Sequence, residues 1–220
     1  MSMDFLRHLD TILLGDCLEV LRALPDKSFD LLLTDPPYGI SADKGTNGFG
    51  VAQNKKYGGG WDNCRPSREH FDEMLRVAKK SIIFGGNYFS DILPPSKCWL
   101  VWDKIGNLSF NNPFADVELI WTNFTHASKK YTVIQQGFVR EDTSARIHPT
   151  QKPIKLLEAI LRDHIEDGFT VLDPFSGSGT TAIAAHRLGR RFLCIEKDAD
   201  YHAASVKRLA KEKEQLLLKI

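Results

Sequence analysis

The segment from Thr170 to Glu196 constrains the fold of this 220-residue chain more than any other part. A short apolar run, Thr170–Asp173, leads into the glycine-rich turn of residues 174–179. The sequence predicts a helix over Thr180–Leu188, followed by a second strand at Arg191–Glu196. A strand, helix and strand in this order join parallel neighbours. The segment therefore predicts an α/β fold with a mostly parallel, twisted sheet and helices on both faces.

The rest of the chain continues the alternation of strands and helices. The expected strands are Thr11–Leu14, Phe29–Thr34, Ser81–Phe84, Cys98–Trp102 and Val117–Thr122, and the expected helices are Leu18–Leu24, Arg68–Lys79, Ile154–Ile165 and Ala199–Leu218. Residues 41–62 are rich in Gly, Asn and Lys, and we expect a mobile loop that closes over a substrate. Residues 123–147 are expected to be irregular and polar. A chain of 220 residues leaves little room for more than one domain, 1–220.

Composition excludes several classes of protein. The hydrophobic fraction is 42%, the formal net charge is only +1, and no apolar run approaches a membrane span. The four cysteines form no Cys-x-x-Cys pair, so neither a disulfide framework nor a metal site is expected. The N-terminal residues contain no apolar signal region, which favours a cytoplasmic protein.

The glycine turn predicts a nucleotide-binding site. Gly177 and Gly179 would let the backbone approach a ligand where a side chain would clash. Glu196 ends the next strand, about 20 residues on, where a carboxylate can accept hydrogen bonds from ribose hydroxyls. Lys197 follows it and could pack along an adenine edge. A Gly-x-Gly-x-x-Ala pattern also fits a nicotinamide or flavin site, so the turn alone does not identify the ligand.

The tetrapeptide Asp35-Pro36-Pro37-Tyr38 predicts the chemistry. It follows a buried strand, so it lies at the carboxyl edge of a parallel sheet, where α/β proteins bind ligands. The carboxylate of Asp35 and the carbonyl of Pro36 form a pair of acceptors that matches the two N–H groups of an exocyclic amine. Tyr38 offers a flat face for a base. The alternative is a simple turn, because Asp and Pro often mark turns.

These motifs together resemble the beta class of DNA amino-methyltransferases, in which the catalytic tetrapeptide precedes the cofactor glycine motif. Two further stretches carry the resemblance. The first begins with Gly15–Glu19 and runs through Asp30–Gly39, and the second is His148-Pro149-Thr150-Gln151-Lys152-Pro153. The resemblance covers nearly the whole chain. It implies a Rossmann-like methyltransferase fold, S-adenosylmethionine as cofactor and double-stranded DNA as substrate, with the target base flipped out of the stack.

The resemblance also assigns roles to individual residues. The implied catalytic residues are Asp35, Pro36, Pro37 and Tyr38, which would hold the flipped base. The implied cofactor-binding residues are Asp16 at the adenine amino group with Cys17 beside it, His148, Thr150 and Lys152 near the methionine carboxylate, Asp173, Phe175, Gly177, Ser178, Gly179 and Thr180 along the methionine and ribose, and Glu196 at the ribose hydroxyls.

The target atom is expected to be N6 of adenine, because the family's usual cytosine-N4 form has Ser where this chain has Asp35. Cytosine N4 and RNA remain alternatives within the class. A nicotinamide-dependent oxidoreductase would leave the tetrapeptide unexplained, and an inactive scaffold is disfavoured by the intact motifs. Methylation at cytosine C5 needs a Pro-Cys nucleophile, and no cysteine here follows a proline.

Basic residues in two segments are candidates for DNA contact. They are Lys44, Lys55 and Lys56 in the loop, and Lys129, Lys130, Arg140 and Arg146 in the interval 123–147. That interval is short for a target-recognition region, so relaxed specificity or a second subunit, as in a homodimer, is expected. A cognate restriction endonuclease is a further expected partner. Trp99 and Trp102 either border the base pocket or belong to the core.

Overall fold

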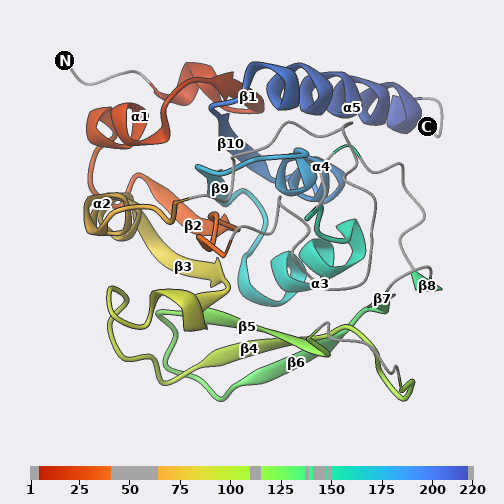
Figure 1. Cartoon of the computed structure of the whole chain (residues 1–220). Coiled ribbons are helices and arrows are strands. Elements are labelled where there is room, and N and C mark those ends of the chain that lie inside the picture. Colours follow the sequence, from red (N-terminus) through yellow and green to blue (C-terminus); the bar gives the residue numbers. More distant parts are fainter. Residues whose placement is uncertain are drawn as a thin grey trace.

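The computed structural model describes residues 5–40, 64–109, 115–136, 139–140, 147 and 150–217. In this part of the chain, one eight-stranded sheet has the order β1-β10-β9-β2-β3-β5-β4-β6 (Figure 1). The strands are β1 (Thr11–Leu14), β2 (Phe29–Thr34), β3 (Ala78–Phe84), β4 (Trp99–Asp103), β5 (Val117–Thr122), β6 (Lys129–Thr132), β9 (Thr170–Asp173) and β10 (Arg191–Glu196). Only the two pairings of β5 are antiparallel, so the sheet is mostly parallel, as predicted.

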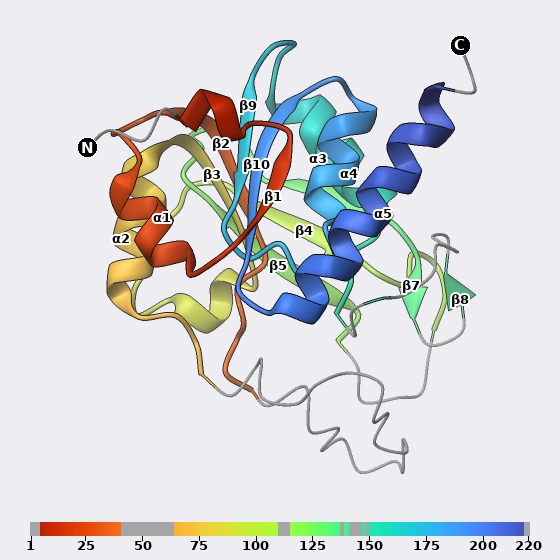
Figure 2. The same ribbon diagram turned by 90° about the horizontal axis from the view of Figure 1, so that it is seen from above.

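Helices cover both faces of the sheet. On one side lie α1 (Cys17–Ala23) and α2 (Arg68–Val77), and on the other lie α3 (Ile154–His164), α4 (Thr180–Arg187) and α5 (Ala199–Leu217). Figure 2 shows the strands between these two layers. The position of β2 between the two helical layers explains why its sequence is a continuous apolar run. Leu31 and Leu33 belong to the core beneath α3 and α4, and Leu32 belongs to the core beneath α1 and α2. None of the described helices is long and apolar enough to cross a membrane.

Two expectations about secondary structure were wrong in part. The helix predicted over Arg68–Lys79 ends at Val77, and β3 starts at Ala78, three residues earlier than expected. The interval 123–147, expected to be irregular, contains β6, which pairs with β4, and a small hairpin of β7 (Gln135–Gln136) and β8 (Val139–Arg140). Within β6 only Tyr131 is buried and the other three residues are exposed, so the sequence lacks the clear apolar alternation of a strand.

The parallel strands bring their carboxyl ends to one edge of the sheet. Asp16 follows β1, Asp35 follows β2, the glycine turn follows β9, and Glu196 ends β10. Strands β2 and β9 are direct neighbours, and so are β9 and β10. The motifs that are scattered along the sequence therefore meet at adjacent strand ends, which is the usual ligand-binding edge of an α/β sheet.

Candidate active site

The glycine turn between β9 and α4 is shaped by two left-handed residues. Gly177 and Gly179 have φ values of 49° and 73°, a region that glycine enters without strain. The backbone N–H of Gly177 donates to Glu196 Oε2 at 2.7 Å, and that of Asp198 donates to Glu196 Oε1 at 2.9 Å. Burial raises the pKa of Glu196 from its usual value despite these donors. The turn thus fixes a carboxylate acceptor at the end of β10, where the sequence predicted it.

Asp173, the last residue of β9, also contacts the glycine turn. Its side chain is only 3% exposed, and its Oδ1 accepts from the hydroxyl of Thr34 at 2.8 Å and from the N–H of Phe175 at 3.1 Å. Burial raises the pKa of Asp173 to about 6. Because Thr34 directly precedes Asp35, this hydrogen bond ties the glycine turn to the start of the catalytic tetrapeptide.

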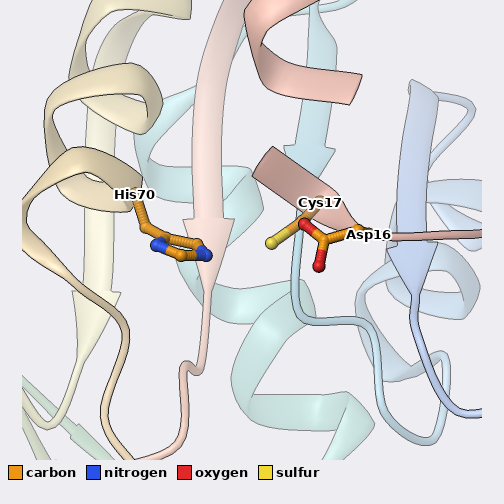
Figure 3. Close-up of side chains that lie close together, drawn as sticks. All are labelled: Asp16, Cys17 and His70. Atoms are coloured by element: carbon orange, nitrogen blue, oxygen red, sulfur yellow. The ribbon is translucent and has the colours of Figure 1, made fainter. Parts of the chain in front are cut away.

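A second part of the predicted cofactor pocket lies at the end of β1. Asp16 caps α1 by accepting from the N–H of Leu18 at 2.9 Å, and its other oxygen accepts from Lys197 Nζ at 2.8 Å. The hydrogen bond from Lys197 lowers the pKa of Asp16. His70, on α2, joins this group, and Figure 3 shows the three side chains of Asp16, Cys17 and His70 close together. His70 could not be predicted from the sequence, because no motif surrounds it.

The Asp16–Cys17–His70 cluster has the residue types of a metal site, since one ligand atom from each lies within 4.8 Å of the others. Burial and the neighbouring Asp16 raise the pKa of the Cys17 thiol to about 12. Both oxygens of Asp16 already accept hydrogen bonds, one from the N–H of Leu18 and one from Lys197, so an ion would have to displace Lys197. Burial lowers the pKa of His70, whose Nδ1 lies 2.8 Å from Ser67 Oγ. A polar pocket of this kind suits an organic ligand better than an ion.

The tetrapeptide Asp35–Tyr38, the predicted catalytic motif, is held by contacts on both oxygens of Asp35. The hydroxyl of Tyr38 donates to Asp35 Oδ1 at 2.6 Å, and Lys152 Nζ donates to Asp35 Oδ2 at 2.5 Å. The ring of Tyr38 stacks on Tyr88 with centroids 4.7 Å apart and also lies directly against Gly85. Burial and the nearby Asp35 raise the pKa of Tyr38 well above its usual value, so the phenol keeps its proton. These contacts orient the side chains of Asp35 and Tyr38.

Lys152 lies at the catalytic motif. Only 8% of its side chain is exposed, and it also lies 3.4 Å from Glu118 Oε2, on β5. Burial alone would lower the pKa of Lys152, but the two carboxylates outweigh it and raise the pKa. The sequence analysis placed Lys152 near the cofactor's methionine carboxylate and missed Glu118, which lies in a strand without any recognisable motif.

The structure brings together some of the remaining predicted residues and not others. Ser178 Oγ lies 2.9 Å from Thr180 Oγ1 at the start of α4, and Thr150 is exposed. His148, Lys44, Lys55, Lys56, Arg146 and the loop 41–62 lie outside the described residues, as does the side chain of Arg140. Trp102 is a core residue that donates to the carbonyl of Val133 at 2.9 Å, and Trp99 is partly buried.

Lys129 and Lys130 are exposed on β6, but each is paired with a carboxylate. Lys129 Nζ lies 2.6 Å from Asp163 Oδ2, and Lys130 Nζ lies 3.0 Å from Asp103 Oδ2. Neighbouring residues of a strand point to opposite faces, so the two side chains do not form one basic patch. A DNA phosphate would have to compete with these acidic partners.

The residues present fit S-adenosylmethionine. Gly177 and Gly179 adopt positive φ and add no side chain to the turn, Glu196 offers its carboxylate beside that turn, and Asp16 presents a carboxylate whose side chain is 34% exposed. Acceptors of this kind suit ribose hydroxyls and an adenine amino group. A Rossmann-like sheet that brings such acceptors to the same edge as an Asp-Pro-Pro-Tyr motif is the arrangement expected of a cofactor-dependent methyltransferase.

Comparisons with known proteins identify the family. A family model described as DNA methylase matches residues 94–207, which is just over half of the chain. The putative methylase YubD of Escherichia coli is 29% identical over 212 residues, covering 89% of this chain and 88% of that protein. This chain therefore belongs to the N6/N4 family of DNA methylases, enzymes that take their methyl group from S-adenosylmethionine.

Solved structures confirm the fold. A putative DNA modification methylase from Thermus thermophilus, in complex with S-adenosylmethionine, superposes with a TM-score of 0.53 at 22% identity and covers 92% of this chain and 95% of that chain. The PvuII DNA methyltransferase, which is cytosine-N4-specific, gives a TM-score of 0.59 at 17% identity and covers 94% and 92%. At these identities the likeness establishes the Rossmann-like fold and does not assign the target base.

Proposed function

We propose that this protein transfers a methyl group from S-adenosylmethionine to N6 of an adenine flipped out of double-stranded DNA. The observation that carries the proposal is the position of Asp35, which directly follows Thr34 and thereby adjoins the cofactor turn through the hydrogen bond to Asp173. Base flipping is needed because an amino nitrogen inside the stack cannot reach a cofactor.

Asp35 and Pro36 would activate the amine by accepting its two N–H groups. An aromatic amine is a poor nucleophile because its lone pair is delocalised into the ring. Two acceptors on its hydrogens favour a pyramidal nitrogen with a localised lone pair, and the Asp35 carboxylate attracts the positive charge that develops there. The contacts from Tyr38 and Lys152 keep this carboxylate oriented, so little reorganisation is needed during the reaction.

The cofactor would be held by the residues that line the glycine turn and the end of β1. Glu196 accepts from the ribose hydroxyls, Asp16 from the adenine amino group, and the backbone at Gly177 and Gly179 allows close approach. When bound, S-adenosylmethionine supplies an electrophilic methyl group on a sulfonium sulfur. Cys17 and His70 lie beside Asp16 and would contact the adenine end of the cofactor.

Adenine is proposed over cytosine because Asp35 stands where the family's usual cytosine-N4 enzymes have Ser. The cytosine-N4 specificity of the PvuII enzyme, a protein of the same fold, keeps N4 of cytosine as the second candidate. The homodimer, the relaxed site specificity and the cognate restriction endonuclease stay predictions.

The test is to identify the methylated nucleoside. Purified protein is incubated with methyl-labelled S-adenosylmethionine and unmethylated duplex DNA, and the DNA is then digested and analysed by mass spectrometry. Labelled N6-methyladenine is the expected product. Labelled N4-methylcytosine would keep the chemistry and refute the choice of base, and label that enters only RNA would refute the substrate.

A further inference from the structure

Three charged side chains meet beside the catalytic tetrapeptide. Lys152 Nζ lies 2.5 Å from Asp35 Oδ2 and 3.4 Å from Glu118 Oε2. Lys152 is nearly buried, with 8% of its side chain exposed, while those of Asp35 and Glu118 are 23% and 22% exposed. One cation is thus shared by two partly buried carboxylates, and these three side chains together carry one negative charge before the more distant Lys104 is counted.

Within the described part of the chain, Lys152 forms ion pairs only with Asp35 and Glu118. Lys152 Nζ lies over the rings of Phe84 at 5.1 Å and Tyr38 at 5.8 Å, so apolar and aromatic groups occupy its other sides. Glu118 has a second cation, Lys104, at the longer distance of 3.7 Å. The other titratable groups facing this cluster are Tyr38 after β2, Tyr88 in the 3-10 helix η3 (Gly86–Phe89), and Asp173 at the end of β9.

We propose that Glu118 is a positioning residue that balances the charge of Lys152, so that Asp35 presents a net negative charge to the bound amino group. The proposal rests on the proposed function. Lys152 orients one oxygen of Asp35, whereas Glu118 prevents Lys152 from neutralising the charge of that carboxylate.

Removing Glu118 and removing Lys152 should change the charge at Asp35 in opposite directions. An ammonium group in contact with Asp35 and without Glu118 cancels the charge that should stabilise the developing aminium, because opposite charges at this range interact strongly where water is largely excluded. Without Lys152, the carboxylates of Asp35 and Glu118 lose the cation that lies between them, and their like charges favour binding of a proton up to higher pH. The two losses therefore differ in their pH dependence.

The test uses Glu118→Gln, Lys152→Met and the double variant, each in full-length protein with S-adenosylmethionine and unmethylated duplex DNA. Single-turnover methyl transfer is measured from pH 5 to 9. In Lys152→Met the acid limb of the pH–rate profile should move up by on the order of one pH unit, with activity recovering at high pH. In Glu118→Gln the plateau rate should fall about tenfold with no upward move of the acid limb.

The double variant separates charge balance from a merely structural role. It restores a single negative charge, so its acid limb should return toward that of the unaltered protein, and near pH 6.5 it should be faster than Lys152→Met. Glu158→Gln, which makes the same change in an ion pair between α3 and α4, serves as the matched control. Additive losses in the double variant, or unchanged acid limbs throughout, would overturn the proposal.

A second readout does not need DNA. The carboxyl carbon of Asp35, followed by NMR across the same pH range, should titrate at higher pH in Lys152→Met and return in the double variant. No methyl transfer by the unaltered protein would refute the proposed function, and this titration would still decide whether Glu118 and Lys152 set the charge of Asp35. An identical Asp35 titration in all variants would refute the charge balance itself.

Discussion

Gly85 is the residue at which a single methyl group should disable the catalytic tetrapeptide. It follows β3 with φ +64°, and a Cβ built there lies 2.3 Å from Cε1 and 2.5 Å from Cζ of Tyr38. Carbon atoms in contact need about 3.5 Å, so the ring in Gly85→Ala must retreat by about 1 Å. Tyr88, stacked 4.7 Å away, limits that retreat.

The displacement should cost both stability and rate. The left-handed backbone alone costs Ala about 1–2 kcal/mol, and the clash adds to this. A misplacement of about 1 Å in a catalytic group reduces rates by on the order of 100-fold. Tyr38 would lose its hydrogen bond to Asp35, while the glycine turn on β9 and β10 stays intact. We therefore expect methyl transfer to fall about 100-fold with the dissociation constant for S-adenosylmethionine unchanged.

Gly189→Ala is the matched control for this prediction. Gly189 has the same φ of +64°, and a Cβ there meets nothing within 4 Å. Urea denaturation of both variants should show the shared backbone strain, with a larger loss for Gly85→Ala. Single-turnover methylation should be impaired only in Gly85→Ala. Equal rates in the two variants would refute the claim that the packing of Tyr38 against Gly85 sets the geometry of the site.

Two further predictions concern the cofactor turn. Burial raises the pKa of Asp173 from 3.8 to about 6, so its contribution to stability is full below about pH 4 and is lost as the pH rises through 6. Relative to the unaltered protein, Asp173→Asn should therefore gain about 2 kcal/mol of unfolding free energy between pH 4 and 7 in urea titrations, and a constant difference would contradict this. Glu196→Gln should weaken S-adenosylmethionine binding at least tenfold in calorimetry, because a charged acceptor is lost, and unchanged affinity would exclude Glu196 from the ribose site.

The strands and helices whose sequences repeat a clear pattern could be predicted closely. Val117–Thr122 and Arg191–Glu196 have the expected bounds, and Ile154–His164 ends one residue before the predicted end. The start of β3 at Ala78 could not be predicted, because Lys79 and Lys80 also fit the last turn of a helix. Strand β6 was missed because only Tyr131 of its four residues is buried and its lysines resemble a polar loop.

The candidate site shows the same division. Asp35, Gly177 and Glu196 were predicted because each belongs to a local motif that follows or ends a strand. Glu118 and His70 were missed because their roles depend on which strands and helices become neighbours. Glu118 reaches the site because β5 inserts between β3 and β4, an antiparallel arrangement that no local pattern indicates.

The most direct test of the central claim is single-turnover methyl transfer by Asp35→Asn, measured together with its affinity for S-adenosylmethionine. Asn keeps the size of the side chain and one acceptor oxygen, but it removes the negative charge that should stabilise the developing aminium. The account predicts that formation of N6-methyladenine in duplex DNA falls by on the order of 100-fold or more while the dissociation constant for the cofactor stays the same. Methylation at the rate of the unaltered protein would contradict the assignment of Asp35 as the catalytic acceptor.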